Sequence, residues 1–151
     1  MLGCNELGHL YNLQLGVSQD YNLAHALYEE ACNSDFFSGC YHLGNLYNNG
    51  KGVSQDYDRA RSLFKKACDS DESGEASLGC LNLGLIYYHG NGVSVDLIKA
   101  RDLYQKDCNA GGFVGCNNLA HMNYYGRAGA CLLYTSPSPR DQRGSRMPSS
   151  A

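Results

Sequence analysis

The sequence lacks the features that would assign it to several common functional classes. No window approaches the roughly eighteen apolar residues of a membrane span, so no membrane-spanning helix is expected. Lys and Arg number 12 against 15 Asp and Glu, and the formal net charge is -3. Because phosphate binding requires a basic stripe, nucleic acid is not expected as a partner. The first residues also lack the charged and apolar regions of a signal peptide.

The pattern of cysteines and histidines excludes a typical metal site. The chain has 8 cysteines and 5 histidines. No two cysteines have the C-x2-C spacing of zinc ligands, and the histidines form no paired set, so neither a metal nor another cofactor is expected. Disulfides fit the cysteines better. Because disulfides persist in oxidising compartments, a secreted or periplasmic location is expected.

What the sequence does contain is an internal repeat. Three near-copies of one segment begin at Gly3, Gly39 and Gly79, and a fourth begins at Gly115, so the starts lie 36, 40 and 36 residues apart. This period is typical of a stacked-repeat solenoid. We predict one array over residues 3–127, divided into repeats at 3–38, 39–78 and 79–114 and a partial copy at 115–127.

From about Ala128 the chain departs from the repeated pattern. All three prolines fall in this segment, together with serine and arginine and without an apolar period. No helix is expected there. We predict that residues 128–151 are a disordered, non-native tail that reads like translated cloning sequence. The equally abrupt start suggests that the array is a fragment of a longer secreted one.

Comparing the copies column by column predicts two helices in each. In the first half, fixed leucine, glycine, leucine or isoleucine, and tyrosine columns lie at offsets 0, 1, 3 and 4, which is one face of an α-helix. The glycine column marks a close approach between helices. In the second half the fixed columns lie at offsets 0, 3, 6 and 7. The fixed columns of both halves, which include Met122 and Tyr104, are assigned to the core. The predicted first helices are 3–13, 39–49, 79–89 and 115–125, and the second helices are 20–32, 56–68 and 96–108.

Turn and capping residues separate these predicted helices. Gly50 and Gly90 suit left-handed C-caps, whereas the first copy has Gln14 at this position, which predicts a less regular turn. Each second helix begins at an aspartate suited to N-capping: Asp20, Asp56 or Asp96. The predicted fold is all-α, a right-handed solenoid of antiparallel helix hairpins.

Two disulfide pairings are compatible with such a stack. The cysteine that closes one second helix lies near the cysteine that opens the next first helix. That pairing leaves Cys4 and Cys131 free and joins Cys32–Cys40, Cys68–Cys80 and Cys108–Cys116. Each bridge would contribute about 2.5–3 kcal/mol on the chain-entropy model. The competing pairing joins Cys4–Cys32, Cys40–Cys68 and Cys80–Cys108.

The repeated motif L-G-x-L/I-Y-x-x-G-x-G-V-S-x-D resembles the Sel-one-like repeat, a relative of the tetratricopeptide repeat. The added cysteines, spaced as C-x7-C, resemble those of the Helicobacter cysteine-rich protein family. The resemblance covers Gly3 to about Gly126. It implies a disulfide across each such cysteine pair, which favours the first pairing, and it implies secretion. Four extra residues near 71–74 are expected to lengthen a helix by one turn or to bulge the loop.

The same resemblance implies penicillin binding with slow β-lactamase activity. Ser62 and Lys65 match the S-x-x-K nucleophile motif of serine β-lactamases. No S-D-N or K-T-G motif accompanies them, and the Ser62 column holds Ala26 and Asp102 in the other copies. These two residues are the catalytic candidates, but the residue pattern favours a binding scaffold over an enzyme.

The scaffold hypothesis depends on the variable columns of the first helices. These columns lie at offsets 0, 1, 4, 7 and 8, opposite the packed face, where helix-hairpin solenoids form a concave groove. Asn and His side chains there can hydrogen-bond a protein, an extended peptide or a peptidoglycan-like amide. The candidate groove residues are Asn5, His9, Asn12, His42, Asn45, Asn48, Asn82, Tyr88, Asn118 and His121.

Overall fold

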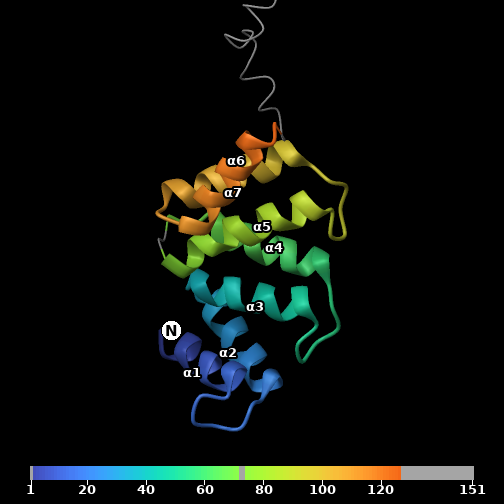
Figure 1. Ribbon diagram of the computed structural model, residues 1–151. Coiled ribbons are helices and arrows are strands. Elements are labelled where there is room, and N and C mark those ends of the chain that lie inside the picture. The colour runs from blue at the N-terminus through green and yellow to red at the C-terminus, as the bar shows by residue number, and fades with distance from the viewer. Residues whose placement is uncertain (1, 72–73, 127–151) are drawn as a thin grey trace, which may run out of the picture.

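The computed structural model describes residues 2–71 and 74–126, and these residues contain helices and no strand. The first helices of the hairpins are α1 (Leu2–Leu13), α3 (Phe37–Asn49), α5 (Leu78–His89) and α7 (Phe113–Tyr124). The second helices are α2 (Tyr21–Asn33), α4 (Tyr57–Cys68) and α6 (Leu97–Asn109). Each helix packs against its chain neighbours, so the hairpins stack in order (Figure 1). The all-α solenoid is confirmed, and the predicted helix windows agree to within two residues.

The predicted N-caps are present on all three second helices. Oδ1 of Asp20, Asp56 and Asp96 accepts hydrogen bonds of 3.0 Å from backbone amides two or three residues ahead. These bonds provide partners for N–H groups that the first turn of a helix leaves without one.

The turn after α1 has the same conformation as the turns after α3 and α5. Gly50 and Gly90 end their helices in the left-handed region with φ of 64° and 73°, and Gln14 has φ of 59°. The predicted irregularity of the first turn is therefore wrong. In every copy the N–H of the capping aspartate donates to the carbonyl of the first-helix tyrosine at 2.9–3.1 Å. This closing bond imposes the turn whichever residue occupies the left-handed position.

Gln14 should therefore be strained, since the left-handed conformation costs an L-residue about 1–2 kcal/mol. We expect Gln14→Gly to raise the free energy of unfolding by about 1 kcal/mol. Gly50→Gln, the reverse change at the equivalent position, should lower it by a similar amount. Urea unfolding of the oxidised protein measures both. A loss of stability in Gln14→Gly would contradict the strain.

Each hairpin is held by a close contact between a first-helix glycine and an aromatic ring of the second helix. A Cβ atom added to the glycine would lie 2.7–2.8 Å from the ring, and the rings are 0–1% exposed. Ordinary carbon contacts are about 3.5–4.0 Å, so no side chain fits. The pairs are Gly8 with Tyr28, Gly44 with Phe64 and Gly84 with Tyr104.

Disulfides join consecutive hairpins in the first of the two predicted pairings. The bridges are Cys32–Cys40, Cys68–Cys80 and Cys108–Cys116, with Cα–Cα distances of 4.5–4.6 Å. Cys4 is free, as this pairing predicts. Cys131 and the predicted tail over residues 128–151 lie outside the described residues.

The second copy has a separate short element after α4 rather than a longer α4. That helix ends at Cys68, and a 3-10 helix, η1, follows at Gly74–Ser77. Ala76 of η1 is fully buried, while Glu75 reaches the side chain of His42 on α3, with Nε2 and Oε2 at 3.1 Å. The insertion thus places a carboxylate against the first helices.

One buried carboxyl breaks the repeat pattern. Asp107 is fully buried at the column that holds Ala31 and Ala67 in the other copies. Its Oδ2 accepts a hydrogen bond of 3.1 Å from the N–H of Gly115 on α7. Burial nevertheless raises the pKa of the Asp107 carboxyl above its ordinary value of 3.8. The folded chain therefore holds this proton more tightly than the unfolded chain does, and stability falls as the pH rises above that value.

Replacing this carboxyl by the alanine of the other copies should stabilise the protein at neutral pH. We expect Asp107→Ala to raise the free energy of unfolding at pH 7 by about 1–3 kcal/mol, the cost of burying an incompletely compensated polar group. The gain should shrink near pH 4, because the raised pKa of Asp107 makes the folded wild type take up its proton more readily as the pH falls. Urea unfolding at the two pH values measures both. A variant that is less stable at pH 7 would show that the bond to Gly115 outweighs burial.

Candidate binding site

The ten predicted groove residues all lie on first helices, but they differ in accessibility. His121 is exposed and seven others are half-buried. Asn5 and His42 are only 6% and 7% exposed. His42 is inside because its ring stacks on Tyr28 with centroids 4.9 Å apart and meets His9 edge-on at 5.2 Å. The sequence columns placed all ten residues on the first helices but could not show which of them pack inward.

Two asparagines link the middle of this face. Asn82 Nδ2 on α5 donates to Asn45 Oδ1 on α3 at 2.9 Å. This bond uses one group of each amide and fixes the orientation of both. Asn82 Oδ1 can still accept, and Asn45 Nδ2 can still donate, which are the two functions that pairing with a peptide group requires.

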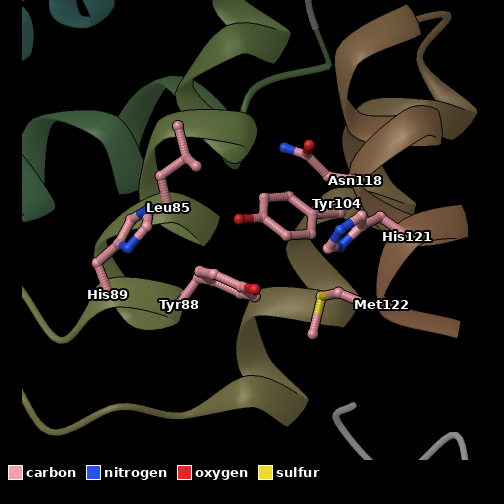
Figure 2. Close-up of a pocket in the computed structure, with 7 residues that line it drawn as sticks. All are labelled: Leu85, Tyr88, His89, Tyr104, Asn118, His121 and Met122. Carbon is pink, nitrogen blue, oxygen red and sulfur yellow. The ribbon is translucent and has the colours of Figure 1, made fainter. Parts of the chain in front are cut away.

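A pocket of about 220 Å³ opens on the same face between α5 and α7. Figure 2 shows the α5 side chains on one side, the α7 side chains on the other and the Tyr104 ring between them. Tyr88, Asn118 and His121 were predicted as groove residues, while Tyr104 and Met122 were assigned to the core. The lining residues are Leu85, Tyr88, His89, Tyr104, Asn118, His121 and Met122.

The residue that lies over the ring differs between the first hairpin and the third. In the first hairpin the His42 ring covers Tyr28. The equivalent of His42 over Tyr104 is Asn118, which lines the pocket together with the ring. This column alone could not have located the pocket from the sequence, because Asn82 occupies it over the fully buried Phe64 ring.

The floor of the pocket supplies a stable hydrogen-bonding group. Tyr104 is 1% exposed, and burial raises the pKa of its hydroxyl, with Tyr88 adding to the effect. The hydroxyl therefore stays protonated at physiological pH and can donate a hydrogen bond. With the Asn118 amide and two imidazoles on the walls, the pocket combines apolar surface with hydrogen-bond donors and acceptors.

The structure does not bring Ser62 and Lys65 into one site. Ser62 is exposed and lines a shallow pocket between α2 and α4 with Glu29 and Arg59, whereas Lys65 lines another between α4 and α6. Lys65 Nζ donates to Asp69 Oδ2, and this bond raises the pKa of the lysine. A lysine held protonated cannot accept the proton of a nucleophilic serine.

The described residues hold no group of three or more metal-ligating side chains. Among the same residues, no helix is both long and apolar enough to cross a membrane.

Comparison with known proteins agrees with this architecture. The Sel1 repeat model matches residues 2–36, 38–72, 77–111 and 114–132. No curated protein matches the sequence significantly. A protective antigen of uropathogenic Escherichia coli with an SLR fold is 30% identical with a TM-score of 0.75, over 85% of this chain and 27% of that one. A Sel1 repeat protein from Oxalobacter formigenes is 21% identical with a TM-score of 0.73, over 84% and 51%.

Helicobacter pylori cysteine rich protein B is also similar, with 30% identity and a TM-score of 0.62 over 78% of this chain and 88% of that one. The chain thus spans about a quarter and about half of the two longer proteins, and most of the third. The family model matches most of the sequence, and the described residues form stacked hairpins joined by disulfides. The chain therefore belongs to the Sel1 repeat family.

Proposed function

We propose that this chain is a disulfide-stabilised scaffold that binds an extended peptide, or a peptidoglycan-like chain of amides, along its first helices. The observation that carries this proposal is the pocket over Tyr104, where three predicted groove residues meet around a buried hydroxyl. Peptide recognition needs side-chain pockets for specificity and amide partners for register. The first-helix face has both.

The dimensions of the pocket favour a side chain over a free small molecule. Pockets for small ligands have volumes of about 300–1,000 Å³, and this one has about 220 Å³. An apolar or aromatic side chain can pack on Tyr88 and Met122 while its backbone amide meets Asn118. Farther along the same face, Asn45 and Asn82 present a donor and an acceptor to the next peptide group.

Three bridges between residues 32 and 116 support a second part of the proposal, that the scaffold works outside the cytosol. Structural disulfides are rare where thiols are kept reduced. No observation favours β-lactam hydrolysis, because Ser62 and Lys65 line different pockets.

Peptide selection on the full chain tests the binding proposal. Peptides enriched from a random phage-displayed library should bind the oxidised chain, and Asn118→Ala combined with His121→Ala should weaken that binding about tenfold or more, since loss of pocket contacts removes the anchor. Fluorescence anisotropy of the synthesised peptides measures the affinity. Thermal unfolding confirms that the variant is folded.

Ser62→Ala is the matched control on the opposite helices, and it should leave peptide affinity unchanged. Peptides that bind the double variant as tightly as the wild type would contradict the assigned face. Hydrolysis of nitrocefin that Ser62→Ala abolishes would favour the enzyme instead.

A further inference from the structure

A different pocket lies between the second helices α4 and α6, over α5. It has a volume of about 440 Å³, within the range of about 300–1,000 Å³ that is typical of small-molecule sites. In the stack, α3 packs on α4 and α7 packs on α6, so this pocket lies inside the array. Its lining residues are Lys65, Asp69, Leu83, Tyr87, Lys99, Asp102, Leu103 and Lys106.

The pocket between α2 and α4 offers a comparison within the same chain, because it is built from the equivalent columns. It has a volume of about 220 Å³, and Arg59 is its one lining cation. The apolar columns hold leucine and tyrosine in both pockets, whereas three lysines line the pocket between α4 and α6. The columns that differ change from Glu29, Asn33, Arg59 and Ser62 to Lys65, Asp69, Lys99 and Asp102.

Two of the three lysines converge on one carboxylate. Lys65 Nζ on α4 donates to Asp69 Oδ2, and Lys106 Nζ on α6 donates to Asp69 Oδ1 at 3.3 Å. The bond from Lys65 lowers the pKa of the Asp69 carboxyl, and Lys106 adds to the effect. One ionised carboxylate neutralises only one of two ammonium groups, and each ammonium has three N–H donors. This end of the pocket therefore has positive charge and donors for a second anion.

The other charged residues do not reverse this balance. Lys99 Nζ lies 5.2 Å from the centroid of the Tyr87 ring and 3.6 Å from Asp96 Oδ2. Asp102 accepts hydrogen bonds of 3.0 and 2.7 Å from the guanidinium of Arg101. With these two neighbours included, four cations face three carboxylates, a net charge of +1 in a chain whose formal net charge is -3.

The floor of the pocket is apolar. Leu83 on α5 is only 5% exposed, and Tyr87 and Leu103 are half-buried. Lys99 and Lys106 lie seven residues apart on α6, which is about 10 Å along a helix, and Leu103 lies between them. A ligand that fits therefore combines an apolar body of about this length with a negative group.

We propose that the pocket between α4 and α6 binds a small organic acid. Its carboxylate accepts hydrogen bonds from Lys65 and Lys106, and its aliphatic or aromatic body packs on the leucines and the Tyr87 ring. Surface ion pairs contribute little to stability, so the two lysines can turn toward a ligand, and their hydrogen bonds to its carboxylate are charge-assisted. This site is separate from the pocket over Tyr104 and has twice its volume.

Four simple probes test both parts of the assigned chemistry. The full oxidised chain is titrated with octanoate, octanamide, octylamine and acetate, and binding is followed by backbone NMR. We expect octanoate to give saturable shifts at residues of α4, α5 and α6. Octanamide lacks the charge and acetate lacks the body, so each should bind at least about tenfold more weakly. Octylamine should give no saturable shift there.

Charge-matched variants separate this pocket from the general effect of positive charge. Lys65→Gln with Lys106→Gln should weaken octanoate about tenfold or more. Lys51→Gln with Arg59→Gln, the same charge change in the preceding repeat, should not. The side chains of Lys65 and Lys106 are 67% and 50% exposed, so both proteins should fold, and thermal unfolding checks this.

The inference is overturned if octanoate gives no saturable shift at these helices, if octanamide or acetate binds equally well, or if the two double variants weaken octanoate equally. The tripeptide Gly-Gly-Leu, which ends in a free carboxylate, should bind no more tightly than octanoate. Tighter binding would overturn the assignment to a small molecule in favour of a chain terminus. None of these outcomes bears on peptide binding over Tyr104, which is tested separately through Asn118 and His121.

Discussion

The contact between a first-helix glycine and an aromatic ring of the second helix is the constraint on which the rest of the structure depends. A ring that is 0–1% exposed lies where any Cβ on the first helix would collide with it. The contact fixes how closely the two helices approach and at which residue. The contact recurs in three hairpins, so the two helices of each hairpin lie at the same spacing. The bridging cysteines of successive hairpins therefore meet at equivalent positions.

The same contact explains where binding chemistry can arise. The ring is held on one side by the glycine, and the residue of the next first helix that lies over it differs between copies. His42 covers Tyr28, whereas Asn118 leaves a pocket over Tyr104. Variation at one column thus changes the binding face without disturbing the packed columns. This separation of packing and variable positions is the physical basis of a repeat scaffold.

Internal repetition made most of the fold predictable from the sequence. Helix windows, aspartate caps and two candidate disulfide pairings followed from columns that three copies share, since each copy serves as evidence for the others. The family resemblance favoured the pairing that the structure has. Features found in a single copy were not predictable in this way. Gln14 follows the turn of its glycine counterparts because a backbone bond closes it. Gly74–Ser77 form η1, which has no counterpart in the other copies.

The candidate site was predicted only in part for a related reason. Period and offset identify a helix face, and Tyr88, Asn118 and His121 do lie together on it. Period and offset do not reveal contacts between side chains of different elements. His42 was assigned to the open groove but packs on Tyr28 and meets Glu75. Tyr104 was assigned to the core, where it is buried, yet it also forms the floor of the pocket.

A double-mutant cycle between Gly44 and Phe64 tests the central constraint most directly. On an exposed helix, alanine is more stable than glycine by about 1 kcal/mol. Here Gly44→Ala should destabilise the oxidised chain by about 1–3 kcal/mol because the new methyl group meets the Phe64 ring. In the Phe64→Leu background the same change should cost at least about 1 kcal/mol less. Equal costs in the two backgrounds, or a stabilising Gly44→Ala, would contradict this account of how the hairpins are held.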